Sequence, residues 1–348
     1  MKNRILRAEE ISSIRNNYGL NLISQLPFRD GNNAETITKI KTTSKKDYVV
    51  KIYEPYFPRE LIEFHAKVSN HLNRDEIPAP KVLQNKNRSL VTSFMDRNYI
   101  IMSFLPGQYP KKDAENTPEI VFSTLAKVLK SLSKFKPETI YEQEIYKIPL
   151  SKQLKSFQDL LPNKPRNSVD EYVLAYQERL SKLVHSVERK VDSLKIPTQI
   201  IMGDFNLETL LVSDSKVTGV LDFDFVHKNR KIFDVIHTID LFCIDKETEE
   251  KELDKRVDWN RLERCMKAYS RVDKEIYSQI EIAPLMLQLK GLSDIIRVWK
   301  KGYEPNVSDK EKEYFKRRIK FFVYRTEIAT KYWREIIHHL KEGYKCVT

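Results

Sequence analysis

The sequence predicts an α+β protein of two lobes, a small β-rich lobe over residues 1–103 and a larger helical lobe over residues 104–348. Two observations predict this arrangement. Short runs of alternating apolar and polar residues, separated by turn residues, dominate the first hundred positions, whereas apolar residues at helical spacing dominate the remainder. The 348-residue length supports a sizeable hydrophobic core, and 41% hydrophobic with 32% charged residues indicates a globular chain rather than a disordered one.

The first lobe is predicted to begin with a helix over 8–18, followed by strands within 21–53. The best of these strands covers 47–53. One of its faces carries Tyr48, Val50 and Ile52, and the other carries Val49, Lys51 and Tyr53. Lys51 is therefore a lone charge in an apolar strand. A helix over 59–72 and strand-like runs over 82–83 and 99–104 complete this lobe.

The second lobe is predicted to be mainly helical, with one strand pair. Its predicted elements are helices over 121–135 and 169–194, strands over 210–212 and 217–221, and helices from residue 230 onward, with loops near 246–252 and 302–308. No internal repeat and no low-complexity tract interrupts this order.

The sequence contains no apolar run as long as a secretory signal or a membrane span requires. We therefore expect a cytoplasmic protein with no membrane partner. The three cysteines, Cys243, Cys265 and Cys346, lack C-x-x-C spacing, which predicts neither a disulfide framework nor a zinc site.

The formal charge of +12 raises the question of an anionic partner. The densest basic run, 316–320, is interleaved with aromatic residues at helical spacing, as in an ordinary amphipathic helix packed on a core. No nucleic-acid-binding signature accompanies it. We expect no specific nucleic-acid partner, and only weak nonspecific binding at low salt.

Three acids form the most informative pattern in the chain. Asp204 follows a glycine within the run 201–211, and Asp222 and Asp224 end a predicted strand 18 and 20 positions later. Clustered carboxylates are usually stabilised by a divalent cation, or one of them serves as a base. Phosphoryl transfer needs both functions, and Lys51 would supply positive charge for the phosphates. A lone Gly-Asp or Asp-Phe-Asp is common by chance. The phosphoryl-transfer interpretation therefore depends on the presence of Lys51 and on the order of the two lobes as well as on the acids.

The acids lie in segments similar to those of the aminoglycoside phosphotransferase and choline kinase superfamily, whose fold resembles that of protein kinases. In that family the catalytic segment reads H-G-D-L-H-P-x-N-[LV]-L and the metal segment reads G-[VI]-I-D-F-[DE]. The chain most resembles the type II homoserine kinase branch, with bacterial spore-coat kinase-like proteins as neighbours. Supporting segments are 17–20, 62–64, 71–72, 77–80 and 233–238.

The resemblance implies ATP and Mg²⁺ as cofactors and assigns a role to each matching residue. Asp204 matches the catalytic base, Asp222 the metal-binding acid, and Asp224 a second acid near metal or substrate. Lys51 matches the ATP-binding lysine. The nucleotide loop would fall on Asp30, Gly31, Asn32 and Asn33, and the hinge that meets the adenine on Met102, Ser103, Phe104 and Leu105.

Several positions depart from the family pattern. Met202 and Asn206 replace the two histidines of the catalytic segment, and Thr209 replaces its metal-binding Asn, although Thr209 and Asn206 still offer oxygen ligands. His65 aligns with the helix glutamate that would pair with Lys51, and Glu63 and Glu60 are nearby. A histidine after the hinge is also missing, because 131–134 reads Ser-Leu-Ser-Lys. These departures support an alternative, a catalytically degenerate kinase-like binding or scaffolding protein (a pseudokinase).

The acceptor is open at this point: a hydroxyl of an amino alcohol, an amino acid such as homoserine, a sugar or an aminoglycoside-like molecule. His227 follows the acids closely. The resemblance implies an acceptor pocket against the late helices, to which some of Asp240, Arg297 and Trp299 would contribute. Each of these four is more often a structural residue. The sequence predicts no oligomeric state.

Overall fold

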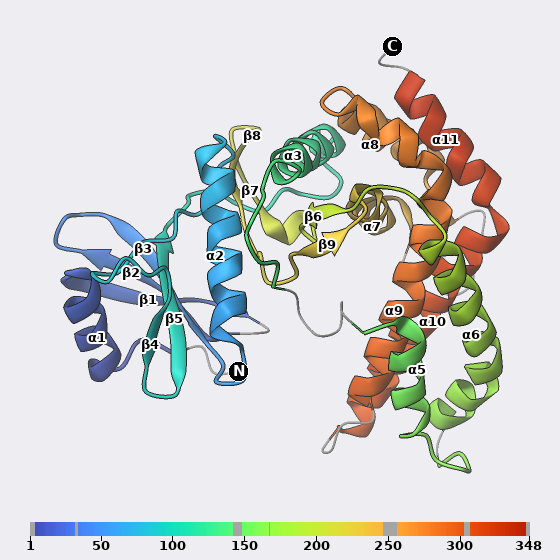
Figure 1. The fold of residues 1–348 in the computed structure, drawn as a ribbon, viewed down its shortest axis with the longest axis horizontal. Helices are drawn as coiled ribbons and strands as arrows, with labels where there is room; N and C mark the ends of the chain where they lie inside the picture. Colours follow the sequence, from blue (N-terminus) through green and yellow to red (C-terminus); the bar gives the residue numbers. More distant parts are fainter. Residues whose placement is uncertain are drawn as a thin grey trace. The chain divides into compact units, whose positions relative to one another are not determined.

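The computed structural model describes residues 4–31, 34–141, 148–166, 168–245, 256–302 and 307–345. The chain folds as two compact units, the first formed by Met1–Glu142 with Asn206–Lys228 and the second by Gln143–Phe205 with Asn229–Thr348. The sheet precedes a predominantly helical region, which confirms the predicted α+β class (Figure 1). Within the described ranges, no helix is both long and apolar enough to cross a membrane.

The first unit is built on a five-stranded antiparallel sheet. Its strands stand in the order β1 (Leu22–Gly31), β2 (Ala34–Thr42), β3 (Asp47–Tyr53), β5 (Arg97–Ser103) and β4 (Thr92–Phe94). In this register Lys51 lies between Ile37 of β2 and Ile100 of β5. The lysine predicted to bind phosphates is therefore on a central strand, where the backbone is bonded on both sides.

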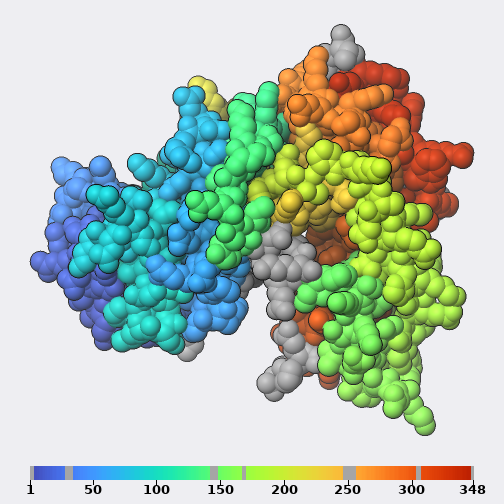
Figure 2. Space-filling view, viewed as in Figure 1, coloured from blue at the N-terminus to red at the C-terminus, as the bar shows by residue number. Residues whose placement is uncertain are grey.

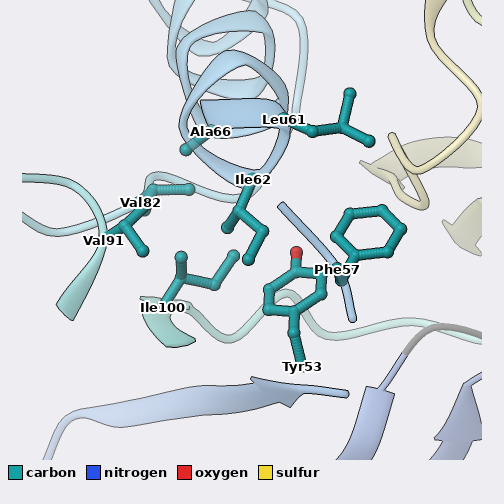
Figure 3. Close-up of a cluster of buried hydrophobic side chains, with 8 residues drawn as sticks. All are labelled: Tyr53, Phe57, Leu61, Ile62, Ala66, Val82, Val91 and Ile100. Carbon is teal, nitrogen blue, oxygen red and sulfur yellow. The ribbon is translucent and has the colours of Figure 1, made fainter. Parts of the chain in front are cut away.

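Two helices cover the two faces of this sheet. α1 (Ala8–Tyr18) packs on the face that carries Val50 and Ile52, and α2 (Arg59–Arg74) packs on the face that carries Tyr53. The predicted alternation along β3 is thus confirmed. Figure 3 shows Ile62 and Ala66 of α2 pointing toward this second face. The buried cluster there comprises Tyr53, Phe57, Leu61, Ile62, Ala66, Val82, Val91 and Ile100.

The remainder of the first unit holds the segment with two of the three acids, Asp222 and Asp224. It contains α3 (Thr117–Leu132), the short 3-10 helix η1 (Leu207–Thr209) and the hairpin of β7 (Leu210–Ser213) and β8 (Lys216–Val220). Both turn residues of this hairpin, Asp214 and Ser215, have positive φ, 49° and 61°, as a two-residue hairpin turn requires. The Val220 N–H donates to the Pro78 carbonyl at 2.7 Å, which ties the hairpin to the segment after α2.

The second unit is helical. Its elements are α5 (Leu150–Gln158), α6 (Ser168–Asp192), the short strand β6 (Gln199–Ile201), α7 (Lys231–Cys243), α8 (Trp259–Ser270), the 3-10 helix η3 (Lys274–Ile282), α9 (Ala283–Gly302), α10 (Asp309–Lys331) and α11 (Trp333–Lys345). The strand β9 (His227–Asn229) leads into α7. Helices α9 and α10 pack against each other, and Figure 2 shows the side chains of α5 (green) and α6 (yellow-green) on the near face of this unit.

The α9–α10 pair is closely packed at one glycine. A Cβ added to Gly291 would overlap Thr326 Oγ1 and would lie 3.3 Å from the Phe322 carbonyl oxygen. At the start of α10, Ser308 accepts from the Glu311 N–H, and the Glu311 carboxylate accepts from the Ser308 N–H, which is a capping box. The sequence itself thus marks where α10 begins.

Candidate active site

The loop that carries Asp204 is anchored by a carboxylate of α7. Asp234 is fully buried, and its two oxygens accept the backbone N–H groups of Met202 and Gly203 at 2.7 and 2.9 Å. Gly203 has a φ of 80°, a conformation that favours glycine. Burial raises the pKa of Asp234 to about 7 although the two N–H groups favour its charged form. Asp234 therefore fixes the backbone immediately before Asp204.

The Asp204 carboxylate receives a hydrogen bond from His237, one turn further along α7. The His237 Nε2 lies 3.0 Å from Asp204 Oδ1. Burial alone would raise the pKa of Asp204, but the bond from His237 and the charges of Lys290 and Arg297 lower it overall. Burial lowers the pKa of His237. The pair is therefore an ionised carboxylate and a neutral imidazole whose Nε2–H donates the hydrogen bond. The Asp204 side chain is 41% exposed, so its carboxylate can accept a further hydrogen bond.

Asp234 and His237 complete the candidate site, although no catalytic motif in the sequence singles them out. They lie three residues apart on α7, so both face the Asp204 loop. In the sequence, the segment 233–238 serves only as a mark of resemblance. The spacing Asp-x-x-His directly after the acids is the signal that could have found them.

A buried charge network lies on the neighbouring helices of the same unit. Asp294 accepts from Lys290, Arg297 and Arg325, with distances of 2.7–2.9 Å, and Arg325 also pairs with Asp240. Burial would raise the pKa of Asp294, but these cations hold it well below its usual range. Asp240 is thus part of the internal network, and Arg297 contributes its charge near Asp204.

The other two residues considered for a site have structural environments. Trp299 is buried and stacks on Phe157, with ring centroids 4.7 Å apart. His227 is buried, and its Nδ1 lies 2.8 Å from the Phe225 carbonyl oxygen, to which it donates.

Lys51 forms a buried ion pair with Asp224. Its Nζ lies 2.8 Å from each carboxylate oxygen of Asp224, and 4.7 Å from the centre of the Tyr53 ring. The exposed fractions of the two charged side chains are 11% and 8%. Burial alone would lower the pKa of Lys51, but the charges of Asp224 and Asp222 raise it overall. Lys51 is therefore a fixed cation in the first unit.

The expected partners of Lys51 on α2 are corrected by the structure. The Glu63 carboxylate pairs with Lys67 at 3.1 Å. His65 is buried, and within the described residues neither of its ring nitrogens has a hydrogen-bond partner. Its Nδ1 lies 3.9 Å from Asp224 Oδ1, and burial lowers its pKa to about 4. The helix offers Lys51 a neutral ring, and the carboxylate comes from the loop after β8 instead.

Asp222 occupies a strained position directly after β8. Its φ is 61°, a left-handed conformation that is uncommon for a residue other than glycine. The Leu221 N–H donates to the Thr209 carbonyl at 2.8 Å, so the loop is bonded on one side of Asp222. Such strain persists where the surroundings impose it and is frequent at functional sites.

The two further residues expected near a metal support the turn at η1. The Thr209 hydroxyl accepts from the Asn206 N–H at 3.0 Å and donates to the Asn206 carbonyl at 2.8 Å, and Asn206 Oδ1 accepts from the Glu208 N–H at 2.8 Å. Among the residues that the structure describes, no three His, Cys, Asp or Glu side chains are grouped as a metal site. The chemistry of the donors still fits a hard cation, because carboxylate, amide and hydroxyl oxygens are the ligands that Mg²⁺ takes.

The expected nucleotide-binding residues are only partly described. Gly31 is the last residue of β1, and Asn32 and Asn33 lie outside the described residues. At the hinge, the N–H groups of Ser103 and Phe104 donate to the carbonyls of Lys81 and Asp47 at 2.9 and 3.3 Å. Met102 lies within β5, and Leu105 follows directly after Phe104.

The expected site residues fall into two groups. Lys51, Asn206, Thr209, Asp222 and Asp224 belong to the first unit, together with the hinge. Asp204 belongs to the second unit, and the chain passes into the first one residue later, after Phe205.

The family model described as "Phosphotransferase enzyme family" matches residues 25–268. A homoserine kinase of Zymomonas mobilis is 22% identical over 248 residues, 69% of this chain and 72% of that protein.

Solved structures similar to this chain include two small-molecule kinases. An amicoumacin kinase in complex with AMP-PNP, Ca²⁺ and Ami has a TM-score of 0.68 and 14% identity, and the similarity covers 92% of each chain. A microcompartment-associated aminopropanol kinase has a TM-score of 0.66 and 13% identity, covering 93% of this chain and 97% of that one. These structures confirm the predicted kinase-like fold. The family model spans more than half of the sequence, and the chain therefore belongs to the phosphotransferase enzyme family.

Proposed function

We propose that this protein transfers the γ-phosphate of ATP, in the presence of Mg²⁺, to a hydroxyl group of a small molecule. One observation carries the proposal: Asp204 is an ionised, partly exposed carboxylate held by His237 on a loop that Asp234 fixes. A base for phosphoryl transfer needs this combination of charge, access and fixed position.

In the proposed reaction, the oxygen of the acceptor hydroxyl attacks the γ-phosphorus, and Asp204 accepts the hydroxyl proton. The bond from the γ-phosphorus to the β–γ bridging oxygen breaks, and ADP leaves. The hydrogen bond from His237 holds one carboxylate oxygen, so the orientation of the base is fixed before the substrate binds. Because the pKa of Asp204 is lowered, the carboxylate is charged at neutral pH and ready to accept a proton.

The nucleotide would be bound by residues of the first unit. Asp222 would hold Mg²⁺ with oxygen from Asn206 or Thr209, and when bound the ion supplies positive charge to the β- and γ-phosphates. Lys51 would contact the phosphates. The adenine would contact the hinge, Met102–Leu105. It would bind backbone carbonyl groups there and the backbone of Leu105, because the N–H groups of Ser103 and Phe104 already donate to Lys81 and Asp47.

We propose an acceptor from the classes that the similar proteins' names indicate. Those proteins are a homoserine kinase, an amicoumacin kinase and an aminopropanol kinase. A first panel therefore contains homoserine, amino alcohols, sugars and aminoglycosides. Because the reaction consumes ATP, we place it in the cytoplasm, and we propose neither a membrane nor a specific nucleic-acid partner.

The test is Asp204→Asn assayed for phosphoryl transfer across this panel. The amide keeps the shape of the side chain but cannot accept the proton, so we expect turnover to fall by at least about 100-fold while ATP binding is largely retained. Glu208→Gln, which removes a charge from the same loop, is the matched control and should keep its activity. Undiminished turnover in Asp204→Asn would exclude Asp204 as the base.

A second candidate function is nucleotide binding without catalysis. It is favoured by the side chains of Asn206 and Thr209, which are already bonded within the η1 turn. This candidate predicts Mg²⁺-dependent ATP binding with no turnover on any acceptor of the panel. Transfer to a single acceptor, lost in Asp204→Asn, would decide against it.

A further inference from the structure

Lys51 is a buried cation whose counter-ion comes from an unexpected element. We infer that Asp224 is the positioning residue of Lys51. It supplies the carboxylate that α2 does not supply, because α2 presents His65 at this position. The pairing is a property of the fold. Its effect on nucleotide binding rests on the proposed function.

The Lys51–Asp224 pair is a close, buried ion pair, so Asp224 acts as the counter-ion of Lys51. Both oxygens of Asp224 lie 2.8 Å from Lys51 Nζ, and at most about a tenth of either side chain is exposed. A buried ammonium without a carboxylate is strongly destabilising, because its lost hydration is not replaced. Some carboxylate must therefore hold Lys51 in this fold.

The α2 helix does not supply that carboxylate. His65 faces the pair, with Nδ1 3.9 Å from Asp224 Oδ1, and its ring also neighbours the rings of Phe57 and Phe64. A neutral imidazole cannot balance the charge of an ammonium. Glu63 is two residues away on the helix and pairs with Lys67. The two carboxylates whose charges act on Lys51, Asp224 and Asp222, both come from the loop after β8.

This source has a consequence that a partner on α2 would not have. Asp224 lies two residues after Asp222, so the ion pair fastens the loop with the proposed metal ligand to the central strand of the sheet. An ammonium has three N–H donors, and the two bonds to Asp224 fix the direction of the third. Lys51 and Asp222 are thus positioned together, by one residue.

The experiment relocates the carboxylate from the loop to the helix. Three variants are compared with the wild type: Asp224→Asn, His65→Glu with Asp224→Asn, and His65→Gln with Asp224→Asn. In the absence of ligand, Asp224→Asn should lower the melting temperature by about 5 °C or more, because it removes the carboxylate to which Lys51 is directly bonded. The Glu-containing double variant should regain most of this loss, and the Gln-containing control should not.

Kinetics separate positioning from mere stability. Asp224→Asn should raise the KM for ATP about tenfold, with little change in the acceptor KM, and His65→Glu should reverse this change. If Asp224 were instead a metal ligand, the variant would raise the Mg²⁺ requirement, and a carboxylate on α2 would not correct it. That result, or unchanged stability and ATP KM in Asp224→Asn, would overturn the inference.

Two further measurements keep the test decisive. If Asp224→Asn does not fold, Lys51→Met with Asp224→Asn removes both charges, and this double variant should be more stable than either single variant. A double variant no more stable than Lys51→Met alone would overturn the pairing. If the wild type binds no ATP, the proposed function fails, while the ligand-free melting temperatures still decide whether Asp224 holds Lys51.

Discussion

His65 shows how a single buried residue can make stability depend on pH. Its ring lies in the core between α2 and the sheet of the first unit, and burial lowers its pKa from 6.5 to about 4. The unfolded chain takes up a proton at the higher pKa, whereas the folded chain resists protonation. The stability that results is complete above about pH 6.5 and is lost as the pH falls toward 4.

We predict that His65→Leu removes this part of the acid sensitivity. Between pH 7 and pH 5 the wild type should lose roughly 2 kcal/mol of unfolding free energy through His65, and the variant should not. Denaturant unfolding at the two pH values measures the difference. His185→Gln, on the exposed surface of α6, is the control. An equal loss in wild type and His65→Leu would contradict the prediction.

At the level of residues, the sequence can single out candidates whose chemistry shows in a local pattern. Asp204, Asp222 and Lys51 are such candidates, because an acid after a glycine, an acid after a strand and a lone lysine in an apolar strand are local patterns. Their roles stay predictions. Their partners were not found. Lys51 and Asp224 are 173 positions apart, and His237 is 33 positions from Asp204, so the pairings follow from the fold and not from neighbouring residues.

At the level of elements, the α9–α10 pair depends on a missing side chain. We predict that Gly291→Ala destabilises the protein by about 1–2 kcal/mol, because the overlap with Thr326 and the nearby Phe322 carbonyl exceeds the helical advantage of alanine. Thermal or denaturant unfolding measures the change.

The same chain offers a control and a rescue for this prediction. A Cβ at Gly302 would make only ordinary contacts with Phe315, at 3.6–4.0 Å, so Gly302→Ala should cost little. Thr326→Ala removes the overlapping hydroxyl and should be less harmful in the Gly291→Ala background than alone. Additive losses in the double variant would show that these two side chains do not collide.

The predictions of helices and strands are accurate where the apolar periodicity extends over a long segment. The helix over 8–18 coincides with α1, and the strand over 47–53 coincides with β3. The three-residue strand β4 and the nine-residue helix α5 were not predicted, because such short segments contain little periodicity. The β4–β5 turn is also unmarked, since Met95 adopts its φ of 53° without a glycine or asparagine. The predicted boundary between residues 103 and 104 stays a prediction.

At the level of the whole molecule, binding of nucleotide should be visible as stabilisation. We predict that ATP at about 100 times its Kd raises the melting temperature by about 4 °C when Mg²⁺ is present, because the ligand binds only the folded state. Asp222→Asn should lose the Mg²⁺-dependent part of this shift. Scanning fluorimetry with and without each ligand measures it.

A second aspartate provides the control for this experiment. Asp214 also has a positive φ, 49°, in the β7–β8 turn, and asparagine tolerates that conformation. Asp214→Asn should therefore keep the full shift. A Mg²⁺-dependent shift of equal size in Asp222→Asn would remove Asp222 from the metal site.

The path of the chain through the two units limits how such a protein can be recombined. Residues 206–228, with both Asp222 and Asp224, return to the first unit between two segments of the second. A fragment ending at residue 142 would keep Pro78 but lose the hairpin bonded to it, and Lys51 would lose its counter-ion. Exchange of one unit between relatives thus needs three crossovers, after residues 142, 205 and 228. A single crossover after residue 142 or 205 yields a chimaera in which Lys51 and Asp224 come from different parents.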